Sequence, residues 1–274
     1  MKNTEINIVN EQNAEEAFSK QSSVFDKLYN ENIIIQYKRA RVRSHIEKFL
    51  QPNSNILELN SGTGEDAIYF ATRSHTIHAT DVSTGMQQKL TEKVYNAGLQ
   101  KLITTEICSF TQLEQLKNKG PYDLIFSNFA GLNCTGELTK VMLSFSSLLK
   151  PGGRVTLVIM PGFCLWETLL AFKGNFKTAF RRFRSSHGAS ANVEGVKFLC
   201  WYYTPSYIIR SLESDFKVLG VEGLCSIVPP SYFENFPKKH TWLYKRLVWL
   251  ENKLKSKWPW KYVGDYFIIS LQKN

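Results

Sequence analysis

Cysteine pairs at metal-binding or disulfide-forming spacing are missing from this sequence. The five cysteines are scattered, with no C-x-x-C pair: Cys108, Cys134, Cys164, Cys200 and Cys225. Zinc sites and disulfide-stabilised folds depend on clustered cysteines. We therefore predict reduced, mostly buried thiols in a cytoplasmic protein that binds no metal.

Long apolar runs, internal repeats and linkers rich in Pro, Gly and Ser are also missing. No run approaches the ~18 apolar residues that cross a bilayer, and the start, MKNTEINIVNEQNAEEAF, lacks the basic and apolar stretches of a secretion signal. With 274 residues, of which 43% are apolar and 21% charged, the chain can bury a sizeable core. We expect one cooperative unit, as a monomer or homodimer.

Acidic residues are scarce in the second half of the chain. Residues 161–264 hold 16 Lys and Arg against 7 Asp and Glu, whereas residues 1–160 hold 17 against 16. An excess of basic residues is used to bind nucleic acid or anionic membranes, although it is often simply solvated. All three interpretations stay open at this point.

The centre of the chain alternates strand-like and helical segments. Strands are expected at Asn55–Asn60, Thr76–Asp81, Ile103–Ile107, Asp123–Ser127 and Arg154–Met160, with closing strands at Lys217–Cys225 and Asp265–Leu271. Helices are expected within residues 13–50 and at Gly64–Arg73, Gly85–Ala97, Glu137–Leu149 and Pro205–Glu213. Because strands such as VTLVIM are apolar throughout, the pattern predicts an α/β fold with a seven-stranded, mostly parallel sheet covered by helices on both faces.

Two insertions interrupt this alternation, at residues 161–203 and 228–264, and we expect both to form helical caps. Phenylalanines at 172, 176, 180 and 183 recur at helical spacing among basic residues, so we expect a helix that packs them on the domain. The alternative is an apolar, positively rimmed entrance. Leucines at 243, 247, 250 and 254 predict a second packing helix, with contact to an anionic membrane surface as its alternative.

The stretch ILELNSGTGEDAIYFA, residues 56–71, combines a strand, a glycine turn and a helix. It satisfies the dinucleotide pattern G-x-G-x-x-A, but Glu65 and Asp66 lie in the first helical turn, where they would repel a phosphate. They can also simply complement the helix dipole. Glu58 on the strand end suits a cationic ligand, and Asp81 ends the next strand, where a carboxylate can accept ribose hydroxyls. These charges favour S-adenosylmethionine over a dinucleotide.

Residues 54–160 resemble a class I S-adenosylmethionine-dependent methyltransferase. The resemblance is carried by four segments in the family's order: ILELNSGTG, HATDVSTGM, PYDLIFSNFAGLN and LLKPGGRVTLVI. It implies a Rossmann-like domain over residues 54–274 and an N-terminal helical lid over residues 1–53. It also implies S-adenosyl-L-methionine as cofactor and S-adenosyl-L-homocysteine as product.

The resemblance also implies roles for particular residues. Glu58, Gly62 and Gly64 would line the methionine end of the cofactor together with Asn60, Thr63 and Asp66 of the same turn, and Asp81 would bind the ribose. Val82 and Met86 would flank the adenine, Cys108, Ser109 and Phe110 would approach its amino edge, and Asn128, Phe129 and Leu132 would border the sulfonium. Tyr37 and Arg41, one turn apart, would close over the carboxylate or form an ordinary surface pair. Asn60 departs from the family pattern, which has glycine there, but asparagine tolerates a left-handed backbone.

We expect in-line methyl transfer to a small, partly apolar acceptor of aromatic or acyl type, possibly anionic or linked to a carrier. If the acceptor must lose a proton, His187 and Tyr37 are weak candidates for the base. A tRNA or rRNA methyltransferase is an alternative, although the strand end Ser-Asn-Phe-Ala lacks the paired prolines of base-amine methyltransferases. A non-catalytic cofactor-binding protein is another. A short-chain oxidoreductase is disfavoured because no tyrosine has lysine four residues later.

Overall fold

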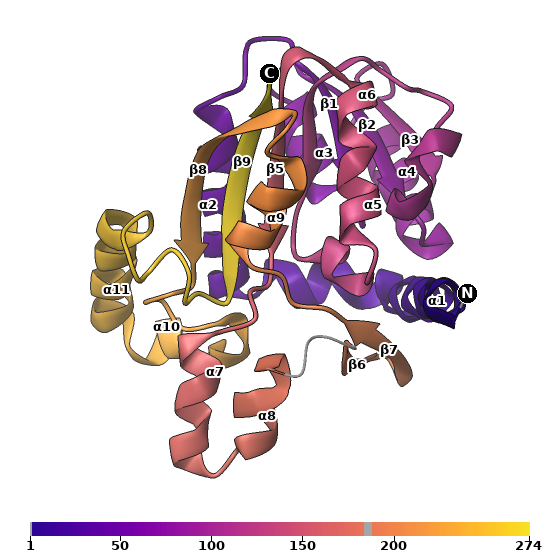
Figure 1. Ribbon diagram of the computed structural model, residues 1–274. Helices are drawn as coiled ribbons and strands as arrows, with labels where there is room; N and C mark the ends of the chain where they lie inside the picture. Colours follow the sequence, from indigo (N-terminus) through magenta and orange to yellow (C-terminus); the bar gives the residue numbers. More distant parts are fainter. Residues whose placement is uncertain (1, 184–187) are drawn as a thin grey trace.

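The computed structural model describes residues 2–183 and 188–274 (Figure 1). At its centre is a seven-stranded sheet in the order β3-β2-β1-β4-β5-β9-β8, in which β1 to β5 are parallel and β9 is antiparallel to β5 and β8. The strands are β1 Asn55–Leu59, β2 Thr76–Asp81, β3 Ile103–Ile107, β4 Tyr122–Ser127, β5 Leu149–Ile159, β8 Phe216–Leu224 and β9 Tyr266–Lys273. The predicted fold class is confirmed, and β5 begins earlier than predicted.

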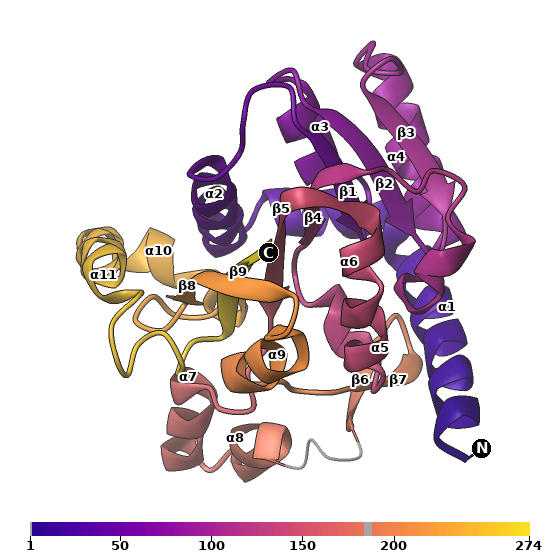
Figure 2. The ribbon, with the colours of Figure 1, turned by 45° about the horizontal axis from the view of Figure 1, so that its top comes forward.

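Helices cover both faces of this sheet (Figure 2). One face carries α2 Ile33–Glu47, α3 Glu65–Ala71 and α4 Thr84–Asn96; the other carries α5 Leu138–Leu143, α6 Phe145–Leu148 and α9 Pro205–Leu212. Because alternate residues of a strand point to opposite faces, Ile56 of β1 packs with Val42 and Phe70, whereas Leu57 packs in the cluster of Phe145. Both faces of the sheet are therefore apolar core.

The two N-terminal helices occupy different positions relative to the sheet. Helix α1, Lys2–Asn30, lies across the carboxyl ends of the parallel strands (Figure 1). Helix α2 begins after Asn32, whose side chain accepts hydrogen bonds from the backbone N–H groups of Ile34 and Ile35 and so caps the helix. Since α2 packs on the sheet, only α1 lies across the strand ends, and a lid formed by residues 1–53 stays a prediction.

The first insertion is only partly helical. It holds α7 Leu165–Leu169 and α8 Phe176–Phe180, joined by a 3₁₀ turn, and then a β-hairpin of β6 Ala189–Val193 and β7 Val196–Cys200. The two-residue turn of this hairpin uses positive φ at Glu194 and Gly195, which matches the twist of paired strands. The prediction of an entirely helical cap was wrong for residues 189–200, because the turn signal at Glu194-Gly195 was overlooked.

The packing predicted for the phenylalanines of this insertion was also wrong. Phe172 is 88% exposed and Phe176 is 60% exposed. Arg182, by contrast, is 2% exposed and bound on both sides: its Nη2 lies 2.7 Å from Glu167 Oε1 and 2.8 Å from Asp265 Oδ1. The buried carboxylates thus draw this cation inward and leave the aromatic side chains outside.

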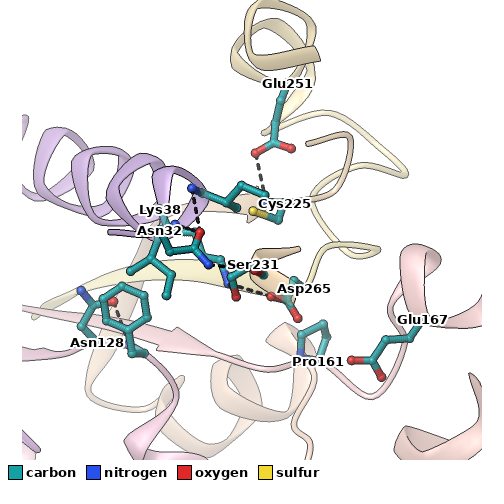
Figure 3. Close-up of polar contacts among 12 residues, drawn as sticks. Asn32, Lys38, Asn128, Pro161, Glu167, Cys225, Ser231, Glu251 and Asp265 are labelled. Carbon is teal, nitrogen blue, oxygen red and sulfur yellow. Dashed lines mark hydrogen bonds and ion pairs between the residues drawn. The ribbon is translucent and has the colours of Figure 1, made fainter. Parts of the chain in front are cut away.

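A buried ion network links the insertion to α2 and to Asp265, just before β9. Figure 3 shows Lys38, Ser231 and Asp265 of this network. Lys38 donates to Asp265 Oδ2 at 2.9 Å and to Ser231 Oγ at 3.1 Å. Burial alone would raise the pKa of Asp265, but Lys38 and Arg182 hold it below its usual range. Removing one partner would leave an uncompensated charge, so the network fixes the insertion in place.

The second insertion contains α10 Phe236–Lys239 and α11 Thr241–Leu254. Tyr244, Leu247 and Val248 of α11 pack against the core around Cys225. Leu250 instead faces outward. The predicted packing helix is present, but the face that packs is formed by Tyr244, Leu247 and Val248 and not by the expected stripe of leucines.

Candidate active site

A cavity lies beyond the carboxyl ends of β1, β2 and β4, the edge at which parallel sheets bind ligands. Most residues predicted for the cofactor line this one cavity: Glu58, Asn60, Gly62, Thr63, Asp66, Asp81, Val82, Met86, Ser109, Phe110, Asn128 and Phe129. They come from several separate strand ends, so the topology of the sheet brings them together.

The turn between β1 and α3 forms one wall of the cavity. Gly62 and Gly64 have φ of +55° and +79°, a region that is costly for residues with a side chain. A β-carbon on Gly64 would lie 1.9 Å from Leu90 Cδ1, whereas the space beside Gly62 is open. The backbone of this turn can therefore approach a ligand closely.

Asn60 stands where a glycine was expected, and the structure explains why. Its φ is +45°, and its side chain binds the neighbouring strand end. Nδ2 donates to the carbonyl of Asn128 at 2.9 Å, and Oδ1 accepts from Ser127 Oγ at 2.6 Å. Gly131 gives this amide room, because a β-carbon there would lie 2.3 Å from Asn60 Cγ. Asn60 thus joins β1 to β4.

Glu58 is the unpaired acid of the cavity. It is 3% exposed, and among the described residues its Oε2 has no hydrogen-bond partner. Burial, together with the nearby carboxylate of Asp66, raises the pKa of Glu58 well above its usual range. A buried carboxyl group of this kind favours a cationic ligand, which would stabilise its charged form.

The two carboxylates that begin α3 are already paired. Asp66 contacts Arg43 Nε at 2.7 Å and Arg39 Nη1 at 3.2 Å, and Glu65 contacts Lys93. Their charges are therefore largely neutralised within the protein. The predicted repulsion of a phosphate by these two residues was the wrong reason for excluding a dinucleotide.

Asp81 is held by the backbone around it. Its Oδ2 accepts from the N–H of Gly62 at 2.9 Å and its Oδ1 from the N–H of Ser83 at 2.8 Å. Burial raises the pKa of Asp81, and these backbone hydrogen bonds oppose the increase. Because each carboxylate oxygen has two lone pairs, both can still accept a ligand hydroxyl.

The model of a family described as "Methyltransferase domain" matches residues 56–153, which include Glu58, the glycine turn and Asp81. Residues 56–153 thus match a methyltransferase domain, and the strand order around them is that of the class I fold. Domains of this family use S-adenosylmethionine as their cofactor.

Among curated relatives, this chain is 33% identical over 128 residues to a hybrid PKS-NRPS synthetase, mycA, of Thermothelomyces thermophilus. The match covers 45% of this chain and 3% of the synthetase. The chain thus spans only a small part of the length of this relative.

Solved structures share the fold at low sequence identity. The 1,6-didemethyltoxoflavin-N1-methyltransferase of Burkholderia thailandensis has a TM-score of 0.57 at 12% identity, covering 96% of this chain and 88% of that one. The geranyl diphosphate C-methyltransferase of Streptomyces coelicolor has a TM-score of 0.55 at 13% identity, covering 86% and 79%. These similarities concern the fold alone.

Helix α1 contributes a wall of the cavity that sequence reasoning missed. The lining residues from α1 are Glu11, Ala14, Phe18, Phe25 and Tyr29. The signal was present, because four of these residues, from Ala14 to Tyr29, recur at helical spacing on one face. Arg39 of α2 was missed as well, as were Ser61, Glu65, Gly131 and Cys134.

Tyr37 and Arg41 are not among the residues that line the cavity. Instead the hydroxyl of Tyr37 donates to Glu251 Oε1 at 2.9 Å, and Arg41 binds Glu251 at 3.3 Å and Glu222 at 3.2 Å. Glu251 is fully buried. The prediction that this pair closes over the cofactor is corrected, because buried acids of the second half of the chain bind both side chains.

Three further predicted cofactor residues, Gly64, Cys108 and Leu132, also lie outside the cavity lining. Gly64 shapes the turn, and Leu132 is fully buried in the core. His187, the candidate base, lies outside the described residues.

Cys164, Glu167 and Asp265 place one potential metal-ligating atom each within 4.8 Å of the others. Arg182 bridges the two carboxylates, so a cation of the protein already satisfies them. The cluster shares Asp265 with the buried ion network around Lys38.

Proposed function

We propose that the methyltransferase holds its cofactor with Glu58 facing the ammonium group and Asp81 facing the ribose hydroxyls. The unpaired oxygen of buried Glu58 supports this placement. Val82, Met86 and Phe110 offer apolar surface for the adenine. When bound, the cofactor supplies an electrophilic methyl group, and the protein has to hold an acceptor in line with it.

The acceptor in this proposal is a small, partly apolar molecule of aromatic or acyl type. The observation that carries it is an aromatic wall beside the end of β4. The rings of Phe25 and Tyr29 stack at 4.0 Å, Tyr29 meets Phe129 edge-on at 6.3 Å, and the guanidinium of Arg39 lies 4.9 Å from the ring of Phe129. Such a wall suits a flat ring or an acyl chain.

A thioester on a carrier is one form that such an acceptor can take. The relative mycA is a hybrid PKS-NRPS synthetase, and this name favours an acyl or peptidyl acceptor. Within residues 2–183 and 188–274, no histidine lines the cavity.

The test is transfer of labelled methyl from S-adenosylmethionine to a panel of phenols, fatty-acyl and β-ketoacyl pantetheine thioesters, and tRNA. Label should enter an apolar small molecule or thioester and be lost in Gly62→Arg. Label in tRNA alone would replace the acceptor class with nucleic acid. Binding of S-adenosylhomocysteine without transfer to any member would favour the non-catalytic alternative.

A further inference from the structure

The two insertions expose large aromatic side chains to solvent. In the first, Phe172, Phe176, Phe180 and Phe183 are all at least half exposed. In the second, Trp242 is 68% exposed, Trp249 is 57% exposed and Trp258, just beyond α11, is 80% exposed. Isolated apolar residues are common on surfaces, but this many large rings in two neighbouring segments indicate an interaction site. We call these residues the aromatic face.

The two insertions adjoin one another. In Figures 1 and 2, α7 and α8 lie beyond the carboxyl end of β5, whereas α11 lies beside β8, with α10 next to it. An apolar groove lined by Trp166 and Leu169 of α7 and by Phe233 and Phe236 of the second insertion connects them. Trp166 and Phe233 are in ring contact at 5.8 Å. The aromatic face therefore spans adjoining elements.

Helix α11 has two different faces. Its inner face packs through Tyr244, Leu247 and Val248. Its outer face alternates rings and cations along successive turns: Arg246 lies 4.8 Å from the ring of Trp242, and Lys253 lies 3.9 Å from the ring of Trp249. The order Trp-cation-Trp-cation keeps both kinds of group on one stripe, parallel to the helix axis.

The cations of this region have few acids to balance them. Residues 228–264 contain eight Lys and Arg but two acids, Glu234 and Glu251. Glu251 is fully buried and accepts hydrogen bonds from Tyr37 and three backbone N–H groups. In the first insertion Glu167 is likewise buried between Arg181 and Arg182. Two of the four acids in the insertions, Glu167 and Glu251, are thus used inside the fold. Glu194 and Glu234 are exposed but are outnumbered by the cations, so the outer surface keeps an excess of positive charge.

We propose that the aromatic face docks the methyltransferase on an anionic lipid bilayer, with α11 parallel to its plane. Tryptophan and phenylalanine enter the headgroup region, while interleaved lysine and arginine bind anionic headgroups. Among the described residues no helix is long and apolar enough to span a bilayer, so the contact is one of surface binding. This inference is independent of the acceptor proposed above.

The experiment is flotation of the full chain with vesicles of phosphatidylcholine alone and with equimolar phosphatidylcholine and phosphatidylglycerol. Binding should require the anionic lipid and weaken with salt. Lys245→Glu with Arg246→Glu should reduce binding about tenfold or more, since each basic residue near the surface contributes about 1 kcal/mol. Trp242→Ser with Trp249→Ser should reduce it by a similar factor and abolish the blue shift of tryptophan fluorescence.

Matched controls are Tyr95→Ser and Lys101→Glu, two exposed positions outside the insertions. Both should bind vesicles like the wild type, and every variant should retain binding of S-adenosylhomocysteine, which shows that the fold and cofactor site are intact. Equal binding to neutral vesicles, or no vesicle binding by protein that binds S-adenosylhomocysteine, would overturn the proposal. So would retention on immobilised tRNA, without vesicle binding, that the same substitutions abolish.

Discussion

The side-chain amide of Asn60 donates a hydrogen bond to the main-chain carbonyl of Asn128, 2.9 Å away. This contact joins the carboxyl ends of β1 and β4, two of the strands beyond which the cavity lies. It also satisfies a buried carbonyl next to Phe129 and Ala130, both of which have positive φ. The asparagine that departs from the family's glycine therefore supports a strained strand end.

Asn60→Ala and Asn60→Gly should separate the two roles of this residue. Both remove the bonds to Asn128 and Ser127, which should lower the free energy of unfolding by about 1–3 kcal/mol. Alanine adds strain at φ +45°, so it should be more destabilising than glycine by about 1 kcal/mol. Urea denaturation of the three proteins measures this, and equal stability of wild type and Asn60→Gly would show that the side-chain bridge contributes nothing.

Glu58→Gln should weaken cofactor binding and raise the free energy of unfolding of the ligand-free protein. An ammonium group bound to a buried carboxylate loses about tenfold or more in affinity when the charge is removed. Calorimetry with S-adenosylhomocysteine measures that loss. Glu58→Asp, which keeps the charge, serves as the matched control and should bind more tightly than Glu58→Gln.

The same residue gives a pH dependence of defined sign. Burial raises the pKa of Glu58 in the folded protein above its ordinary value of 4.5, so between the two values the folded state holds a proton that the unfolded state has lost. The free energy of unfolding therefore falls as pH rises through this window. The Glu58→Gln variant has no carboxyl group to titrate at this position, so its free energy of unfolding should not fall in this way. The difference between its free energy of unfolding and that of the wild type should therefore grow with pH. A difference independent of pH from 4 to about 8 would contradict it.

The order of strands and helices was predictable because it follows local patterns. Apolar strands such as β5, and the glycine turn at Gly62, are readable from neighbouring residues alone. Glu58 and Asp81 were also found this way, since each ends a strand whose place in a parallel sheet is known. The strand ends then met as the topology requires.

Long-range partners were not predictable. Tyr37 and Arg41 looked available for a ligand because no acidic residue lies one turn away from either on their own helix, yet Glu251 binds both from more than two hundred positions away. Asp66 looked like a free charge, although Arg39 and Arg43 neutralise it. Periodicity shows which face of a helix is apolar, but it does not show which distant charge completes a buried pair.

Tyr37→Phe tests the corrected role of that tyrosine. Loss of its hydrogen bond to Glu251 should reduce the free energy of unfolding by about 1 kcal/mol and leave the affinity for S-adenosylhomocysteine unchanged. Glu251→Gln should cost about 3 kcal/mol or more, because it leaves the buried cation of Arg41 poorly paired. Reduced cofactor affinity in Tyr37→Phe at unchanged stability would instead restore the lid role predicted from the sequence.

Tyr29→Ala should separate acceptor binding from cofactor binding. The ring of Tyr29 stacks on Phe25 and meets Phe129, so its removal should raise the KM for the acceptor about tenfold through lost aromatic contact. Leu28→Ala, on the exposed side of the same helix, is the matched control and should behave like the wild type in both respects. Because Glu58 and Asp81 are untouched, the affinity of Tyr29→Ala for S-adenosylhomocysteine should change far less than its KM. An equal loss in the two measurements would assign Tyr29 to the cofactor and leave the aromatic wall without a role in choosing the acceptor.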